Sequence, residues 1–369
     1  MISIHILNAG HGDSIVLEYH GEAGPVYGVI DSNKESGQIP PALNKLHQLG
    51  ADRLSFVALT HPHADHYRGL LDILVAYRGN ISNFYSYPLD HAKEGRLRQL
   101  AEVYTQVFRS TDGKTSRANI KEYLLILNEI KENIGLDRWE EHTGIDSAIV
   151  PEGFAGVDIR AILPLNSAKG QYFQLIQNES PSIVENQDLN ALSIAYNIIY
   201  KGREIILGGD VPYENWLEHK RQNARRVQEL QASVVKLPHH GSKKDCKSNV
   251  VEYMFNSEQE RYACISANGR SHPHRETLLT LRGNDIHPYC TNLAVECGAQ
   301  LNNVSYHDST IDPGLLLLLN RGLDEIPGRG IQPCQGDITI IIDDDGQLSV
   351  NTEHEFPCGF RDELDFLAQ

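Results

Sequence analysis

Short apolar runs that end in histidine or aspartate recur along this chain. Residues 54–59 (LSFVAL) have the pattern of a short buried strand, and they lead directly into the motif THPHADH at 60–66. Pro62 disfavours helix at the start of this motif. The helical spacing of apolar residues between Tyr67 and Leu74 then predicts a helix that begins near Ala64. The histidines are therefore expected on a loop at a strand end and on the first turn of a helix.

Other predicted strands end in the same residue types. Strands ending near 30, 209 and 238 run into Asp31, Asp210 and the pair His239–His240. Helical patterns at 39–49 and 213–230 alternate with the strands, which is typical of an α/β fold. Further strands are predicted at 2–7, 14–19, 156–163, 188–200 and 261–267, and a hairpin closed by Asp-Gly is predicted at 334–350.

Residues 92–150 interrupt this rhythm. Two apolar stripes, at 97–108 and 120–134, are separated by the polar segment STDGKTSR. This pattern predicts a helical-hairpin insertion without chemistry of its own. Its scattered basic residues form either a solvated helix face or a surface for an anionic substrate, and the insertion as a whole is a candidate docking site for a partner protein.

Composition limits the classes of function. The chain of 369 residues has 33 basic and 49 acidic residues, a net charge of −16, which argues against a broad nucleic-acid-binding surface but allows a local basic groove. The N-terminus lacks the pattern of a signal peptide, and no apolar run approaches the roughly 20 residues that span a bilayer. The six cysteines form no CxxC pair. We expect a cytoplasmic protein with free thiols and no membrane segment.

The THPHADH motif carries metal-binding chemistry. His61, His63, Asp65 and His66 offer the imidazole nitrogens and carboxylate oxygens that zinc or manganese accepts. Strand ends of α/β layers gather at one edge, so the later strand ends would add to this set. The total number of candidate ligands exceeds the three or four that a single zinc takes from a protein. It therefore predicts two divalent ions, with Asp210 as the bridging carboxylate. Asp31 either orients a metal-bound imidazole or caps a turn.

These residues resemble a known family. THPHADH is similar to the HxHxDH signature of the metallo-β-lactamase fold. Over about 1–90 and 155–360 the chain also resembles the C-terminal metallo-β-lactamase domain of the competence DNA-uptake protein ComEC. That resemblance implies one domain over 1–369, a four-layer αβ/βα sandwich with the helical insertion and a second, irregular insertion at 295–332. The segments that carry it are HILNAGHGDSIVLEY, VIDSN, DLNALSIAYNI, ILGGD, VVKLPHHGS, SHPHRETL and PCQGDITIIIDDDG.

The resemblance also implies residue roles. His240, rather than His239, is the expected last ligand because it directly precedes the small residue Gly241. His239 is left to contact substrate or to pack the loop, and with Asp65 it is our choice of catalytic residue. The third imidazole usual for metal one is absent from DLNALS, where Asn190 is an alternative weak ligand. The implied set is His61 and His63 for metal one, Asp65, His66 and His240 for metal two, and Asp210 between them.

The segment NGRSHPH supplies the expected substrate contacts. Arg270, His272 and His274 suit an anionic phosphate, although a structural turn before a helix is an equal alternative. His11 and Asp13 on the first turn are weaker candidates. We therefore expect a metal-dependent hydrolase, a phosphodiesterase that uses a metal-activated water on nucleic acid or a nucleotide.

Two other interpretations stay open. The same centre could hydrolyse a phosphorylcholine ester, a lactone or a thioester. Alternatively, the chain is a metal-binding sensor or partner module of a multi-protein system, docked through the helical insertion. Metal content together with activity on a simple phosphodiester separates these classes.

Overall fold

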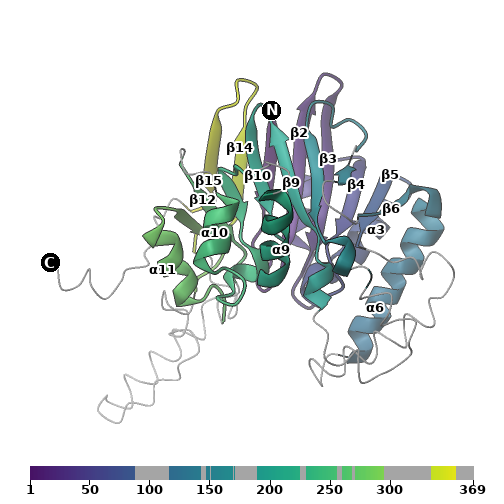
Figure 1. Cartoon of the computed structure of the whole chain (residues 1–369). Coiled ribbons are helices and arrows are strands. Elements are labelled where there is room, and N and C mark those ends of the chain that lie inside the picture. The colour runs from purple at the N-terminus through teal and green to yellow at the C-terminus, as the bar shows by residue number, and fades with distance from the viewer. Residues whose placement is uncertain are drawn as a thin grey trace, which may run out of the picture.

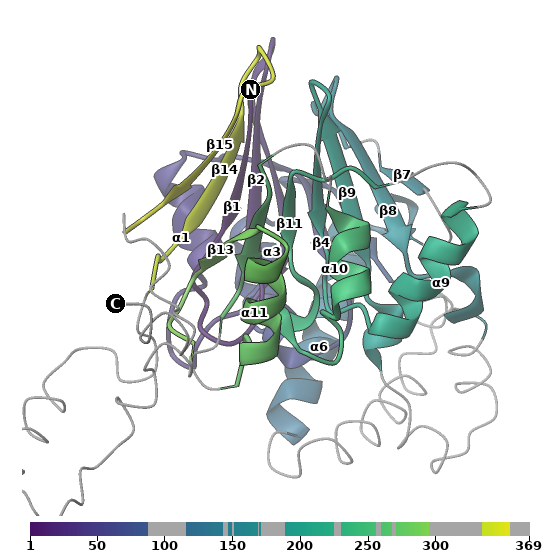
Figure 2. The same cartoon turned by 60° about the vertical axis from the view of Figure 1, so that its left-hand side comes forward.

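A computed structural model gives the arrangement of the chain and describes residues 1–87, 116–142, 147–149, 151–168, 170, 189–224, 230–255, 260–267, 271–294 and 334–354. Two mixed β-sheets form its centre, with helices on their outer faces (Figures 1 and 2). The α/β class and the αβ/βα sandwich expected from the sequence are confirmed. Both 295–332 and the first helix expected in the insertion, at 97–108, lie outside the described residues.

The first sheet combines the N-terminal strands with the C-terminal hairpin. Its described strands have the order β15-β14-β1-β2-β3-β4-β5-β6, and β1 pairs antiparallel with both β2 and β14. The hairpin predicted at 334–350 therefore completes the sheet begun by the first residues. The strands are β1 (Ile2–Ile6), β2 (Ser14–Gly21), β3 (Gly24–Ser32), β4 (Leu54–Leu59), β5 (Ile81–Ser86), β6 (Trp139–Glu141), β14 (Ile338–Ile342) and β15 (Leu348–Thr352).

The second sheet is built from the middle of the chain, with the order β13-β12-β11-β10-β9-β8-β7. β10, β11, β12 and β13 run parallel, so their C-terminal ends meet at one edge. β3 and β4 are likewise parallel in the first sheet. The strands are β7 (Ser147–Ile149), β8 (Asp158–Leu163), β9 (Ala195–Tyr200), β10 (Arg203–Leu207), β11 (Val234–Lys236), β12 (Tyr262–Ile265) and β13 (His287–Cys290).

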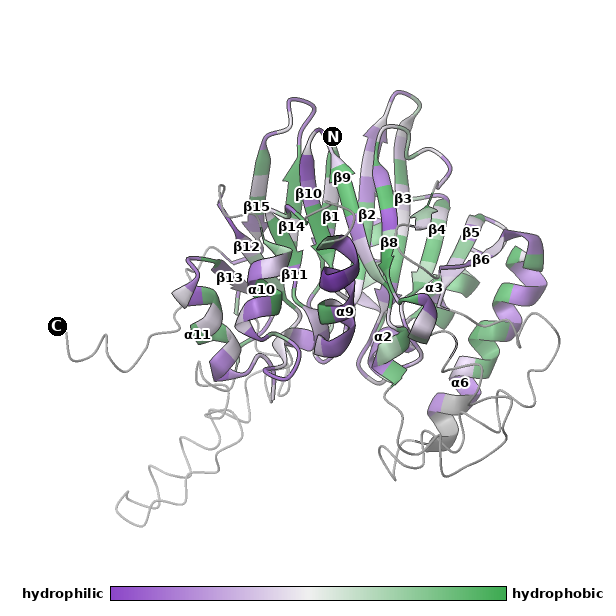
Figure 3. Cartoon of the chain, viewed as in Figure 1, coloured by the Kyte–Doolittle hydropathy of each residue, from purple (hydrophilic) through white to green (hydrophobic). Residues whose placement is uncertain are grey.

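Apolar side chains fill the space between the sheets and beneath the helices. Ile4 of the first sheet and Ile198 of the second belong to one buried cluster. Trp216 and Leu278 belong to another, between the second sheet and its helices. The polar faces of these helices point outward (Figure 3). The main helices are α1 (Pro41–Gln48), α3 (Leu70–Ala76), α6 (Ser116–Glu129), α9 (Tyr213–Ala224), α10 (Ser248–Met254) and α11 (Arg275–Gly283).

Two sequence predictions need correction. The strand predicted over 188–200 begins only at Ala195, because 189–192 form a 3-10 turn, η3 (Leu189–Leu192). The alternation of apolar residues from Leu192 to Tyr200 extends into the last residue of that turn and concealed where the strand begins. In addition, two segments of the predicted helical-hairpin insertion are strands. Among the described residues, 139–141 form β6 at one edge of the first sheet and 147–149 form β7 at one edge of the second. Among the described residues, no helix combines the length and apolarity needed to cross a bilayer.

Candidate metal centre

The THPHADH motif has the predicted local structure. Only Thr60 separates His61 from the end of β4, and the short helix α2 (Ala64–Tyr67) begins after His63. Asp65 and His66 therefore lie on the first turn of α2. His63 has extended backbone, whereas Asp65 and His66 belong to a helix. Their side chains, although close in sequence, therefore approach Asp210 from different directions.

Later strand ends supply the remaining side chains. Asp210 follows β10, and His240 lies in the short segment η4 (Pro238–Gly241) after β11. His239 and His240 both have left-handed backbone, with φ of 48° and 53°. This conformation is costly for residues other than glycine and is typical of functional sites.

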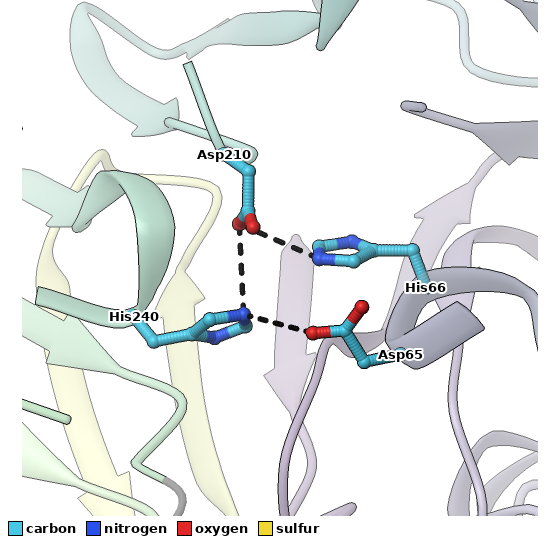
Figure 4. A group of neighbouring side chains, drawn as sticks. All are labelled: Asp65, His66, Asp210 and His240. Carbon is cyan, nitrogen blue, oxygen red and sulfur yellow. Dashed lines mark ion pairs between the residues drawn. The ribbon is translucent and has the colours of Figure 1, made fainter. Parts of the chain in front are cut away.

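Four side chains form what we term the second ligand group: Asp65, His66, Asp210 and His240 (Figure 4). One ligand atom from each lies within 4.8 Å of the others. Oδ1 of Asp210 is 3.4 Å from Nε2 of His66 and 3.6 Å from Nε2 of His240. Nε2 of His240 is also 3.5 Å from Oδ2 of Asp65. Two imidazoles and two carboxylates thus converge from both sheets.

His61, His63 and Asp210 form what we term the first ligand group. Nε2 of His61 lies 3.8 Å from Oδ2 of Asp210, the oxygen other than the one that faces His66. Asp210 therefore faces one group with each oxygen, as a bridging carboxylate must. The partition is the one that the sequence predicted, while the metal-binding roles themselves stay predictions.

Four buried atoms make this centre unfavourable without a cation. Nε2 of His61, His66 and His240 and Oδ1 of Asp210 have no hydrogen-bond partner among the described residues. An unsatisfied buried polar atom costs on the order of 1–3 kcal/mol, so clustering several demands an explanation. A divalent cation would bond to these nitrogens and oxygens directly. The donor set fits such an ion.

Asp31 supports the second ligand group. It lies near the end of β3 with φ of 54°, and its Oδ2 is 2.7 Å from Nδ1 of His66. Thr60 donates its backbone N–H to Oδ1 (2.8 Å) and its hydroxyl to Oδ2 (2.6 Å). Asp31 therefore makes both contacts that the sequence left open, orienting an imidazole and capping the start of the metal loop.

Ser193, in the segment DLNALS that lacks a third imidazole, lies beside the ring nitrogen of His61 that faces away from Asp210. Its hydroxyl accepts a hydrogen bond from the backbone N–H of Asp210 at 2.9 Å and lies 3.5 Å from Nδ1 of His61. Asn190, the alternative weak ligand, is buried in η3.

The rings of His11, His239 and His272, predicted as catalytic or substrate contacts, lie beside His240. Nδ1 of His239 is 2.7 Å from Oδ2 of Asp245, and its Nε2 is 4.0 Å from Oδ2 of Asp210. The His272 ring stacks on His239 at 5.7 Å and lies 4.6 Å from the His274 ring. Nε2 of His11 is 3.1 Å from Oδ2 of Asp65. Arg270 lies outside the described residues.

Buried charges shift the ionisation of the ligands. Burial lowers the pKa of His61, and the nearby His66 and His63 lower it further, so His61 is neutral as a ligand must be. Burial also opposes the charge on His66, but Asp210 and Asp31 overcome it and raise the His66 pKa well above 6.5. A metal ion must therefore displace a proton from His66.

Sequence reasoning missed two contributors. Asp245 follows the PHHGS motif and carries no local signal. Lys236 interrupts the apolar strand VVKLP, and a lysine at this position was the one clue that the sequence offered. The structure buries its side chain completely. Its ammonium pairs with Asp13, a residue that the sequence had ranked only as a weak candidate.

Comparisons with known proteins add a likeness of fold. No family model matches the chain, and no curated protein matches its sequence. Among solved structures, PqqB from Methylobacterium extorquens is 9% identical over 79% of this chain and 99% of its own, with a TM-score of 0.41. A diphosphatase of the PhnP family is 12% identical over 75% of this chain and 90% of its own (TM-score 0.37).

The metallo-β-lactamase fold protein YhfI from Bacillus subtilis is 10% identical over 78% of this chain and 95% of its own (TM-score 0.38). At such identities and scores, these similarities assign no activity or substrate. The finer resemblance to the ComEC domain is not shown by them and stays a prediction.

Proposed function

We propose that this protein is a metal-dependent hydrolase that binds two divalent ions, zinc or alternatively manganese. One observation carries the proposal: Asp210 directs one oxygen to the first ligand group and the other to the second. Two ions held by these groups would polarise a substrate oxygen and lower the pKa of a bound water toward neutrality.

The residues around the ligands suit a phosphodiester. His239 is partly exposed, faces Asp210 and is oriented by Asp245, so it is placed to transfer a proton to a leaving oxygen or to hold a phosphoryl oxygen. His272 and His11 add imidazoles beside His239 and His240. An anionic phosphate of a nucleotide or nucleic acid is the substrate class that these donors favour. The resemblance to the ComEC domain supports the same class.

Metal-reconstituted protein tests the proposal directly. We expect about two bound ions per chain, measured by mass spectrometry of the metal, and hydrolysis of bis-p-nitrophenyl phosphate. A parallel screen of single-stranded DNA, RNA, cyclic dinucleotides and a phosphorylcholine ester identifies the substrate. If the loaded protein cleaves no ester and Asp65→Ala equals wild type in the cell, the hydrolase proposal is wrong and a sensor role is favoured.

A further inference from the structure

An ion pair lies behind the second ligand group. Asp13 belongs to the loop between β1 and β2, and Lys236 is the last residue of β11. Their side chains are almost completely buried and make a direct ion pair. Because β1 and β2 belong to one sheet and β11 to the other, the pair connects the sheets immediately behind the ligands.

Asp13 faces the imidazole that comes from the second sheet. Its Oδ1 lies 3.6 Å from Nδ1 of His240, and neither atom has a hydrogen-bond partner among the described residues. Nε2 of the same ring faces Asp210 and Asp65. A carboxylate behind the ring nitrogen that does not bind metal is the usual arrangement for a metal-bound histidine.

The backbone of Asp13 is tied to the metal loop. Its N–H donates to the carbonyl of Asp65 at 3.1 Å, and its carbonyl accepts from the N–H of Asn33 at 2.9 Å. The Asp13 carboxylate therefore has little freedom to move relative to Asp65. It can therefore hold the ring of His240, which follows β11 of the other sheet, in one orientation relative to Asp65.

Lys236 reaches the bridging residue as well. Its ammonium donates to the carbonyl of Gly209 at 3.2 Å, and Gly209 directly precedes Asp210. The same cation thus contacts the residue behind His240 and the backbone that carries Asp210. Fold stability does not explain such a pair, because replacing a buried ion pair by apolar residues is often neutral or stabilising.

We propose that Asp13 and Lys236 form a positioning unit for the second ligand group. Asp13 orients His240 through Nδ1, as Asp31 orients His66. Lys236 pairs with the Asp13 carboxylate and, through the carbonyl of Gly209, holds the Gly209–Asp210 backbone in place. The inference rests on the proposed function, since the group positioned is a metal ligand.

The double variant Asp13→Leu/Lys236→Met tests this role. Removing both charges together leaves no unpaired buried ion, so we expect a metal-free melting temperature near that of wild type. The second ion should bind about 10- to 100-fold more weakly, the effect typical of lost support behind a ligand. Calorimetric zinc titration and the visible spectrum of the cobalt-substituted protein measure affinity and ligand geometry without any substrate.

A matched control uses the more exposed pair Lys34–Asp72, which joins the residues after β3 to α3 and whose charged atoms are 2.5 Å apart. Lys34→Met/Asp72→Leu should bind both ions like wild type. A second double variant, Asp13→Asn/Lys236→Met, retains the shape of the Asp13 side chain, leaves no buried ammonium unpaired and should also weaken binding of the second ion, so the test does not depend on one variant.

Each outcome separates the proposals. If either Asp13 variant binds the second ion as tightly as wild type with an unchanged cobalt spectrum, the positioning role is wrong and the proposed function stands. If wild type itself binds no divalent ion, both proposals fall.

Discussion

Nδ1 of His66 lies 2.7 Å from Oδ2 of Asp31, and both side chains are completely buried. This contact directs Nε2 of His66 toward Asp210, which lies 3.4 Å away. The carboxylate thus selects the ring nitrogen that is available to a metal.

Asp31→Asn should weaken metal binding by about 10- to 100-fold, because an amide orients and polarises the imidazole less well than a carboxylate. Zinc titration measures the change. Asp52→Asn, in the exposed segment before β4, is the control and should bind like wild type. Unchanged affinity in Asp31→Asn would leave Asp31 with the capping role alone.

Asp210→Asn should lose most of the bound metal and nearly all turnover while the fold remains intact. One amide oxygen cannot replace two carboxylate oxygens that face different ligand groups. Metal content, turnover and far-ultraviolet circular dichroism measure the three properties. Retained turnover would remove Asp210 from the bridging role.

His239→Gln should lower kcat by about 10²- to 10⁴-fold, as expected for a lost proton donor, while metal content stays near wild type. Asp245→Asn should lower kcat by less, because the imidazole remains but loses its 2.7 Å partner. Metal content distinguishes the roles. If His239→Gln loses an ion, His239 is a ligand of the first group rather than a proton donor.

Gly12→Ala should destabilise the chain by about 2 kcal/mol or more and disturb the second ligand group. Gly12 has φ of +124°, and an added Cβ would collide with the backbone carbonyl of Asp65. Urea unfolding and zinc titration measure both effects. Gly50→Ala is the control, because Gly50 also has positive φ but no heavy atom within 4 Å of a Cβ. It should lose some stability and keep full metal affinity.

The stability contributed by Asp245 should vanish in acid. Burial raises its pKa, but the hydrogen bond and charge of His239 outweigh burial and hold the pKa below 3.8. A lowered carboxyl pKa means stability that is fully present above 3.8 and lost as the pH falls through the folded-state value. Metal-free wild type should therefore exceed Asp245→Asn in urea at pH 6, with the difference shrinking below about pH 4. A constant difference down to pH 2 would contradict this.

Local patterns predicted the strands and the helix start that carry the candidate ligands. Residues 54–66 have a strong apolar period followed by Pro62, so both the strand and the start of α2 could be read from neighbouring residues. The same holds for β10 before Asp210 and β11 before His240. By contrast, the apolar alternation of β9 reaches back to Leu192, which belongs to η3. The pattern did not show where the strand begins, because hydrogen bonding rather than side-chain order decides that point.

What the sequence by itself determined is the chemistry at each strand end, because side-chain type and local periodicity are properties of neighbours along the chain. Only the tertiary structure decided which of these ends meet. It brought Asp13 into contact with Lys236, 223 positions away along the chain, and Asp245 into contact with His239. It also placed the two oxygens of Asp210 between the two ligand groups. Such pairings follow from the register and packing of two sheets, where burial forces each polar atom to find a partner, and no local pattern records that choice.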